Sequence, residues 1–164
     1  MKKISISLFL LLAVVCVSVG QNPSSPRVTA ESKNVKVAYG QPSKRGRVIF
    51  GELVPYGQVW RTGANQATEI TFVKDGTFGG KPVKKGTYTL FTIPSETEWT
   101  IILNSQLNQN GAFEYEQNKE KNVLEVRASA KKAANAIEKF TIRPTDTALV
   151  LEWDATTVSV PMKF

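Results

Sequence analysis

Apolar residues in this chain recur at every second position within short stretches, and turn residues separate one stretch from the next. In "NVKVAYG", Val35, Val37 and Tyr39 alternate with polar neighbours. In "TEITF", Ile70 and Phe72 share one face. This period of two is typical of half-buried strands, and no amphipathic helix longer than two turns interrupts the series. We therefore expect an all-β fold, an antiparallel β-sandwich of jelly-roll-like or barrel-like form with at most one or two short helices.

Several other segments refine this expectation. "RVIF" predicts a short strand followed by a looping crossover, and "GTYTLFTIP" has apolar residues on both faces, which indicates a central strand covered on both sides. "KKAANAIEKFTIRP" combines alanines that favour helix with a "KFTIR" pattern that favours strand. "ALVLEW" and "TTVSVPM" predict a closing hairpin that turns at Asp154 and Ala155.

The first twenty residues have the pattern of a secretory signal peptide. Lys2 and Lys3 precede an apolar run that ends at the small residue Gly20. We expect cleavage after residue 20, a lead segment over 21–33 and one β-sandwich domain over 34–164. The mature protein would then be exported, periplasmic or extracellular, without membrane insertion after signal cleavage.

The composition limits the chemistry of the mature chain. The sequence has no histidine, and its one cysteine, Cys16, lies in the expected signal peptide. Disulfides, thiolate nucleophiles, Ser-His-Asp triads and zinc sites built on Cys or His are therefore not expected, nor is any metal or cofactor. The net charge is +7, but the lysines are scattered and no basic helix or RNA-binding signature is present, so nucleic acid is not an expected partner.

The stretch "VWRTGANQATEITF" holds the best candidate site, made of Trp60, Arg61, Thr62, Asn65 and the upstream Tyr56. On an extended chain Trp60 and Arg61 point to opposite faces. The Arg61 guanidinium is a rigid fork suited to a carboxylate or phosphate, but it is equally suited to bracing loop carbonyls inside a fold without disulfides. Trp60 or Tyr56 would supply an apolar wall, and Asn65 would orient the turn.

Other polar and aromatic residues have competing interpretations. Lys44, Arg45 and Arg47 form either an anion-binding loop or an exposed turn with gatekeeping charges, and the second is favoured. Trp99 and Trp153 are expected in the core, because each follows an acidic residue that would take the outer face.

Islands along the chain resemble the bacterial exported family catalogued as domain of unknown function 2911. They are "SPR", "GRVIFGELVPYGQVWRTGANQATEITF", "GTYTLFTIP", "EWTIILN" and "LEWDATTVSVPM", and they run from Ser25 to Met162. The block around "VPYGQVWRTGANQAT" is the most specific of them. The resemblance implies export and a β-rich single domain, and it implies no activity and no catalytic residue.

These observations favour a non-catalytic ligand-binding or interaction module of the bacterial cell envelope. Its ligand would be an anionic or hydroxyl-rich small molecule or a glycan. One alternative is a small carboxylate-dependent, glycosidase-like hydrolase that uses Glu52 or Glu69, although no carboxylate pair is singled out by its spacing. Another is an envelope scaffold protein with a flat apolar patch. The oligomeric state is left open.

Overall fold

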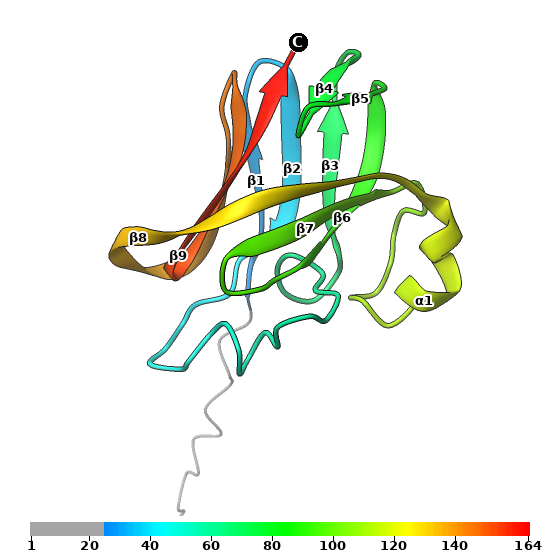
Figure 1. The fold of residues 1–164 in the computed structure, drawn as a ribbon. Coiled ribbons are helices and arrows are strands. Elements are labelled where there is room, and N and C mark those ends of the chain that lie inside the picture. The colour runs from blue at the N-terminus through cyan, green and yellow to red at the C-terminus, as the bar shows by residue number, and fades with distance from the viewer. Residues whose placement is uncertain (1–24) are drawn as a thin grey trace, which may run out of the picture.

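Nine strands hydrogen bond edge to edge into one antiparallel sheet in the computed structural model, which describes residues 25–164 (Figure 1). The strands are β1 Arg27–Glu31, β2 Val35–Gly40, β3 Thr68–Phe72, β4 Gly76–Phe78, β5 Lys81–Val83, β6 Gly86–Ile93, β7 Glu98–Asn104, β8 Asn122–Pro144 and β9 Ala148–Lys163. One short helix, α1 Tyr115–Asn118, is followed by a 3-10 turn, η1 Lys119–Lys121. The signal peptide expected at residues 1–20 lies outside the described residues.

The strand order is β1-β2-β3-β6-β7-β8-β9-β4-β5, and every neighbouring pair is antiparallel. The sheet is not closed, and it curls so that β7 and the first half of β8 cross in front of β1, β2 and β3 (Figure 1). The all-β, sandwich-like fold with one short helix is therefore confirmed. β1 falls within segment 21–33, where the sequence places a lead segment, and it adds a strand beside β2.

The core lies between the two layers of the curled sheet. Alternate residues of β2 and β3 enter it, which explains their period of two, and Val37 and Ile70 are fully buried. Trp99 and Trp153 are 1% and 2% exposed, so both are core residues, as expected. Burying such large rings supplies much of the apolar stabilisation that a fold without disulfides needs.

β6 is a central strand with apolar cover on both sides, as its sequence predicts. Leu90 points into the main core, whereas Phe91 packs with Ile102 and Tyr115 in a second cluster on the opposite face. The Phe91 and Tyr115 rings meet edge to face at 5.1 Å. The polar segment 105–121, which carries α1, therefore covers the outer face of β6 and β7 through Tyr115.

The predicted hairpin at Asp154 and Ala155 is wrong, because β9 continues through both residues as one strand. Asp154 has a positive φ of 50°, which bends the strand without reversing it. Pairing with β8 continues on both sides, at Thr141↔Glu152 and Lys132↔Thr156. Segment 131–144, ambiguous between helix and strand, lies within β8.

The predicted strand at "RVIF" is also wrong. Instead of joining a sheet, this segment bonds to itself around Gly51, whose φ is 93°: Val54 N donates to Ile49 O at 2.9 Å, and Gly51 N donates to Val54 O at 2.9 Å. Ile49 is nevertheless fully buried, so the apolar pattern came from a core contact in a loop.

Within residues 25–164, no helix has both the length and the apolar character needed to cross a membrane. Nor do three or more His, Cys, Asp and Glu side chains gather within that range where they could hold a metal ion.

Candidate binding site

Trp60 anchors the candidate stretch in the core. Its side chain is 9% exposed and stacks on Trp153, with ring centroids 6.0 Å apart and planes inclined by 15°. Phe140 contacts it at 4.9 Å between ring centroids. The indole Nε1 donates to Gly63 O at 3.1 Å, so this buried polar atom is satisfied within its own turn. Trp60 thus forms the base of the site.

Hydrogen bonds from Thr62 and Thr68 hold the turn after Trp60. Trp60 and Thr92 exchange two backbone hydrogen bonds of 2.7 and 3.0 Å, which attaches the turn to β6. The Thr62 and Thr92 hydroxyls lie 3.1 Å apart, and Thr68 Oγ1 donates to Thr62 O at 2.7 Å. Thr62 is fully buried with a φ of 55°, so this predicted ligand-binding residue positions the turn from inside the fold.

Gly40 lets β2 approach the same turn closely. Ala64 N donates to Gly40 O at 3.1 Å. A Cβ at position 40 would lie 2.0 Å from Ala64 O, which no side chain allows. The turn is therefore held by β2 on one side and β6 on the other.

Arg61 points away from the core, as the sequence predicts for the neighbour of a buried Trp60. Its side chain is half-buried, and Nη1 donates to Asn65 O at 3.0 Å. Its Cζ lies 5.2 Å from the centre of the Phe113 ring, a cation–π contact with the 105–121 segment. Asn65 is exposed at a φ of 63°, and its Nδ2 donates to Ser25 O at 3.2 Å. Arg61 therefore braces its own turn while it still borders the surface.

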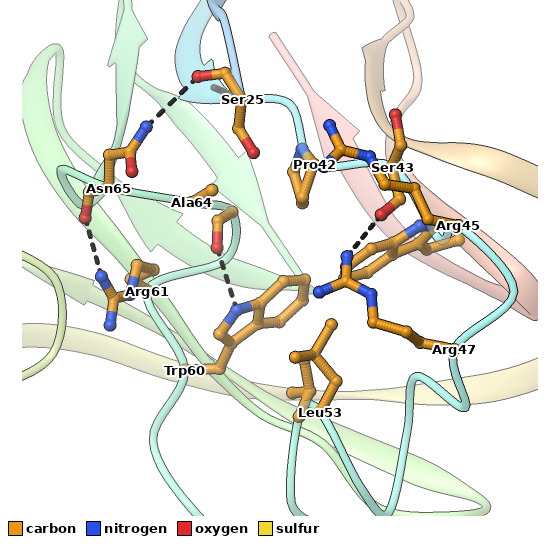
Figure 2. A pocket seen from close by; sticks show the side chains of 13 residues that line it. Ser25, Pro42, Ser43, Arg45, Arg47, Leu53, Trp60, Arg61, Ala64 and Asn65 are labelled. Carbon is orange, nitrogen blue, oxygen red and sulfur yellow. Dashed lines mark hydrogen bonds between the residues drawn. The ribbon is translucent and has the colours of Figure 1, made fainter. Parts of the chain in front are cut away.

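A pocket of about 450 Å³ opens beside this turn (Figure 2). Figure 2 shows Arg61 at one end, Arg45 and Arg47 at the other, and the Trp60 ring between them. Among the described residues that line it, none carries a carboxylate. The lining residues are Ser25, Pro42, Ser43, Arg45, Arg47, Leu53, Val54, Trp60, Arg61, Gly63, Ala64, Asn65 and Trp153.

Backbone carbonyls orient the Arg47 side chain at the far end of the pocket. Arg47 Nε donates to Lys44 O at 3.0 Å, and its Nη2 donates to Ser43 O at 2.6 Å. Arg45 has a φ of 51°, and its backbone N donates to Glu138 Oε1 at 2.9 Å. The Lys44 ammonium is paired with Asp154 of β9. Arg45 and Arg47 are exposed at a turn, as the sequence predicts, and they also border the pocket, while Lys44 bonds to the sheet.

A second, smaller pocket of about 160 Å³ is also lined by Arg61. Leu53, Val54 and Trp60 border both pockets, as Arg61 does. The other residues that line the smaller pocket are Pro55, Gln58, Val59 and Ala112. The combined surface is thus apolar at its base and cationic along its edge.

The remaining sequence candidates lie elsewhere. Tyr56 is 40% exposed and borders neither pocket; a Cβ at Gly51 would lie 3.2 Å from its ring. Glu69 pairs with Arg27 at 3.9 Å and accepts a hydrogen bond from Asn108 N at 3.1 Å. Neither Glu52 nor Glu69 lines the large pocket.

The family model described as "Protein of unknown function (DUF2911)" matches residues 22–162. The chain belongs to the DUF2911 family. The match includes the whole of the large pocket and all but the last residue of β9. Comparison with curated proteins finds no match, and comparison with solved structures finds none either.

Some pocket residues of this DUF2911 domain carry no recognisable signal in the sequence. Pro42, Leu53 and Ala64 come from separate parts of the long 41–67 connection, and they meet because that connection folds back across Trp60. Arg45 and Arg47 form a basic loop in the sequence, but their position across the pocket from Arg61 depends on contacts with β8 and β9, which lie far away in the chain.

Proposed function

We propose that this DUF2911 protein is an exported, non-catalytic binding module that holds an anionic group in the large pocket. The observation that carries the proposal is the set of three arginines, Arg45, Arg47 and Arg61, around a pocket whose described lining has no carboxylate. Guanidinium groups bind carboxylates and phosphates through charge-assisted, often bidentate hydrogen bonds. Arginines that border a pocket whose described lining holds no carboxylate favour such a ligand.

The rest of the pocket favours a ligand that has a ring or a chain attached to its acid group. Trp60 and Leu53 offer apolar contact, and Ser43 and Asn65 offer hydroxyl and amide groups suited to sugar hydroxyls. The volume of about 450 Å³ lies within the usual range for small-molecule sites, roughly 300–1,000 Å³. An acidic sugar or a phosphorylated small molecule meets these requirements.

Export is the second part of the proposal, and it depends on the signal-peptide pattern of residues 1–20. The absence of catalysis is supported by the lack of histidine in the chain and by the lining of the pocket. A hydrolase built on Glu52 or Glu69 has less support, because Glu69 already bonds Arg27 and Asn108.

Calorimetric titration of the mature domain with glucuronate, inorganic phosphate and neutral glucose tests the proposal. Glucuronate or phosphate should bind and glucose should not. Arg47→Gln and Arg61→Gln should each weaken the binding at least about tenfold, because a charge-assisted hydrogen bond contributes about 1.5–3 kcal/mol. Fluorescence of the protein should change on binding, since Trp60 borders the pocket.

Arg143→Gln is the matched control. Arg143 is an exposed arginine of β8 that pairs with Glu152 at 2.8 Å and does not line the pocket. Equal weakening by this substitution would show that the anion responds to net charge alone, and the absence of any saturable anion binding would refute the proposal.

A further inference from the structure

The three arginines of the large pocket lie at two separate ends of it. Figure 2 shows Arg45 and Arg47 on one side of the Trp60 ring and Arg61 on the other. Arg61 belongs to the 60–68 turn, which is attached to β2 and β6, whereas the 44–47 loop is attached to β8 and β9. Two different parts of the fold therefore bring positive charge to opposite ends of one pocket.

Backbone carbonyls hold a guanidinium at each end and leave some of its nitrogens for a ligand. Arg47 donates from Nε to Lys44 O and from Nη2 to Ser43 O, so within residues 25–164 its Nη1 has no hydrogen bond. Arg61 donates from Nη1 to Asn65 O, and its Nε and Nη2 have no hydrogen bond in the same range. A guanidinium that is already held in place loses little further freedom when a ligand binds.

Arg47 is a better ligand contact than Arg45 at the end that they share. The Glu138 carboxylate accepts a hydrogen bond from Arg45 N at 2.9 Å, so a negative charge of β8 already lies near Arg45. Arg47 makes its hydrogen bonds to neutral carbonyls. Its positive charge is therefore the more available of the two for an anion.

The separation of the two ends limits what one acid group can do. Trp60, an apolar ring, lies between Arg47 and Arg61 (Figure 2). A ligand with a single acid group places that group at one end, and only a hydroxyl or water meets the guanidinium at the other. A ligand with two acid groups gives each end a carboxylate or phosphate, which forms the stronger, charge-assisted hydrogen bond.

We propose that the large pocket binds a diacid, a small molecule with one acid group at Arg47, a second at Arg61 and a ring or carbon chain between them on Trp60. This inference rests on the proposed function, because it names the class of anion that the same pocket takes. Ser43 accompanies Arg47 and Asn65 accompanies Arg61 in the lining, and both suit hydroxyl groups of the ligand. A sugar acid with an acid group at each end has the required chemistry.

Calorimetric titration of the mature domain with matched acids tests this inference. D-Glucarate and D-gluconate have carbon chains of equal length, but glucarate has a carboxylate at both ends and gluconate at one. The unbranched diacids from succinate to sebacate, each with the monoacid of equal carbon number, vary the spacing of the two groups. At least one diacid should bind about tenfold or more tightly than its monoacid, because it gains a second charge-assisted hydrogen bond.

Substitution of the arginines shows whether that advantage comes from the two ends. In Arg61→Gln the best diacid should bind within about twofold of its monoacid, because only one cationic end remains. Arg47→Gln should reduce the advantage less completely, since Arg45 stays at that end. Arg143→Gln is the matched control, and it should keep the full advantage because Arg143 lies outside the pocket.

The possible failures are distinguishable. If glucuronate or phosphate binds and no diacid exceeds its monoacid, the diacid inference is overturned while the proposed anion site stands. An advantage that persists in Arg61→Gln, or that Arg143→Gln also removes, overturns the inference as well, because the second acid group then responds to net charge. If no anion binds at all, the proposed function and this inference fail together.

Discussion

At the scale of single residues, adjacent side chains in the 60–68 turn have opposite roles. Trp60 is buried in an aromatic cluster and Arg61 faces the pocket, because neighbouring residues of an extended segment point to opposite sides. The choice between a brace and a ligand contact at Arg61 stays open, because this side chain has features of both. Thr62 holds the turn from inside, and Arg61 donates to Asn65 O while it borders the pocket.

Arg61→Ala should lower the free energy of unfolding by about 1 kcal/mol, because the substitution removes one hydrogen bond and a cation–π contact at a half-exposed site. Urea unfolding of the mature domain measures the change. Arg143→Ala, at an exposed ion pair, should cost less. A loss above about 3 kcal/mol at Arg61 would instead identify a buried brace, whose removal leaves unsatisfied groups inside the fold.

At the scale of elements, the sequence predicts strands best where one face is buried. β2 and β3 are strands where apolar and polar residues alternate in the sequence, because successive side chains of a strand point to opposite faces and only one face is buried. β6 is a strand where apolar residues occur at successive positions, because both of its faces are covered. The strand predicted around Ile49 is wrong, because a loop residue can be buried without belonging to a strand. The turn predicted at Asp154 is wrong for another reason, because this residue bends β9 without ending it.

The candidate site is predictable only in its local part. The turn from Trp60 to Asn65 can be predicted from the sequence, because Gly63 and Asn65 are turn-forming residues that follow an aromatic residue and an arginine. The convergence of Arg45 and Arg47 on the same pocket depends on the fold of the 41–67 connection, and no period along the chain encodes that.

The bend of β9 gives the prediction for this scale. Asp154 has a φ of 50°, a conformation that Asp and Asn tolerate and a β-branched residue does not. Asp154→Val should therefore cost about 2 kcal/mol more than Asp154→Asn, since both lose the pairing with Lys44 and only valine adds strain. Equal midpoints in urea unfolding of the two variants would show that the bend is not strained by the side chain.

At the scale of the whole molecule, β9 joins the β4–β5 hairpin at one end of the strand order to the rest of the sheet. Its first part pairs with β8 and its last residues pair with β4, at Phe78↔Met162 and Thr77↔Lys163. Gly79 N also donates to Pro161 O at 2.8 Å. The β4–β5 hairpin is attached to the sheet through these contacts.

Met162→Ala should therefore lower the free energy of unfolding by about 2–5 kcal/mol, as expected for truncation of a buried methionine. Met162 is 4% exposed and lies in the main core beside the hairpin. Lys163→Ala, at the neighbouring exposed position, should change stability by less than about 0.5 kcal/mol. Similar thermal unfolding curves for the two variants would contradict this role of β9.

The pairing of β4 with β9 also determines when the protein can fold. Phe78 is made early in the chain and Met162 late, so the loss of loop entropy between them precedes the gain from their contact. A nascent chain that lacks β9 has a hairpin without a neighbour and a core open along one side. We therefore expect slow folding that is completed only after β9 has been made. An incomplete chain would stay unfolded until then, and an unfolded chain is compatible with the proposed export.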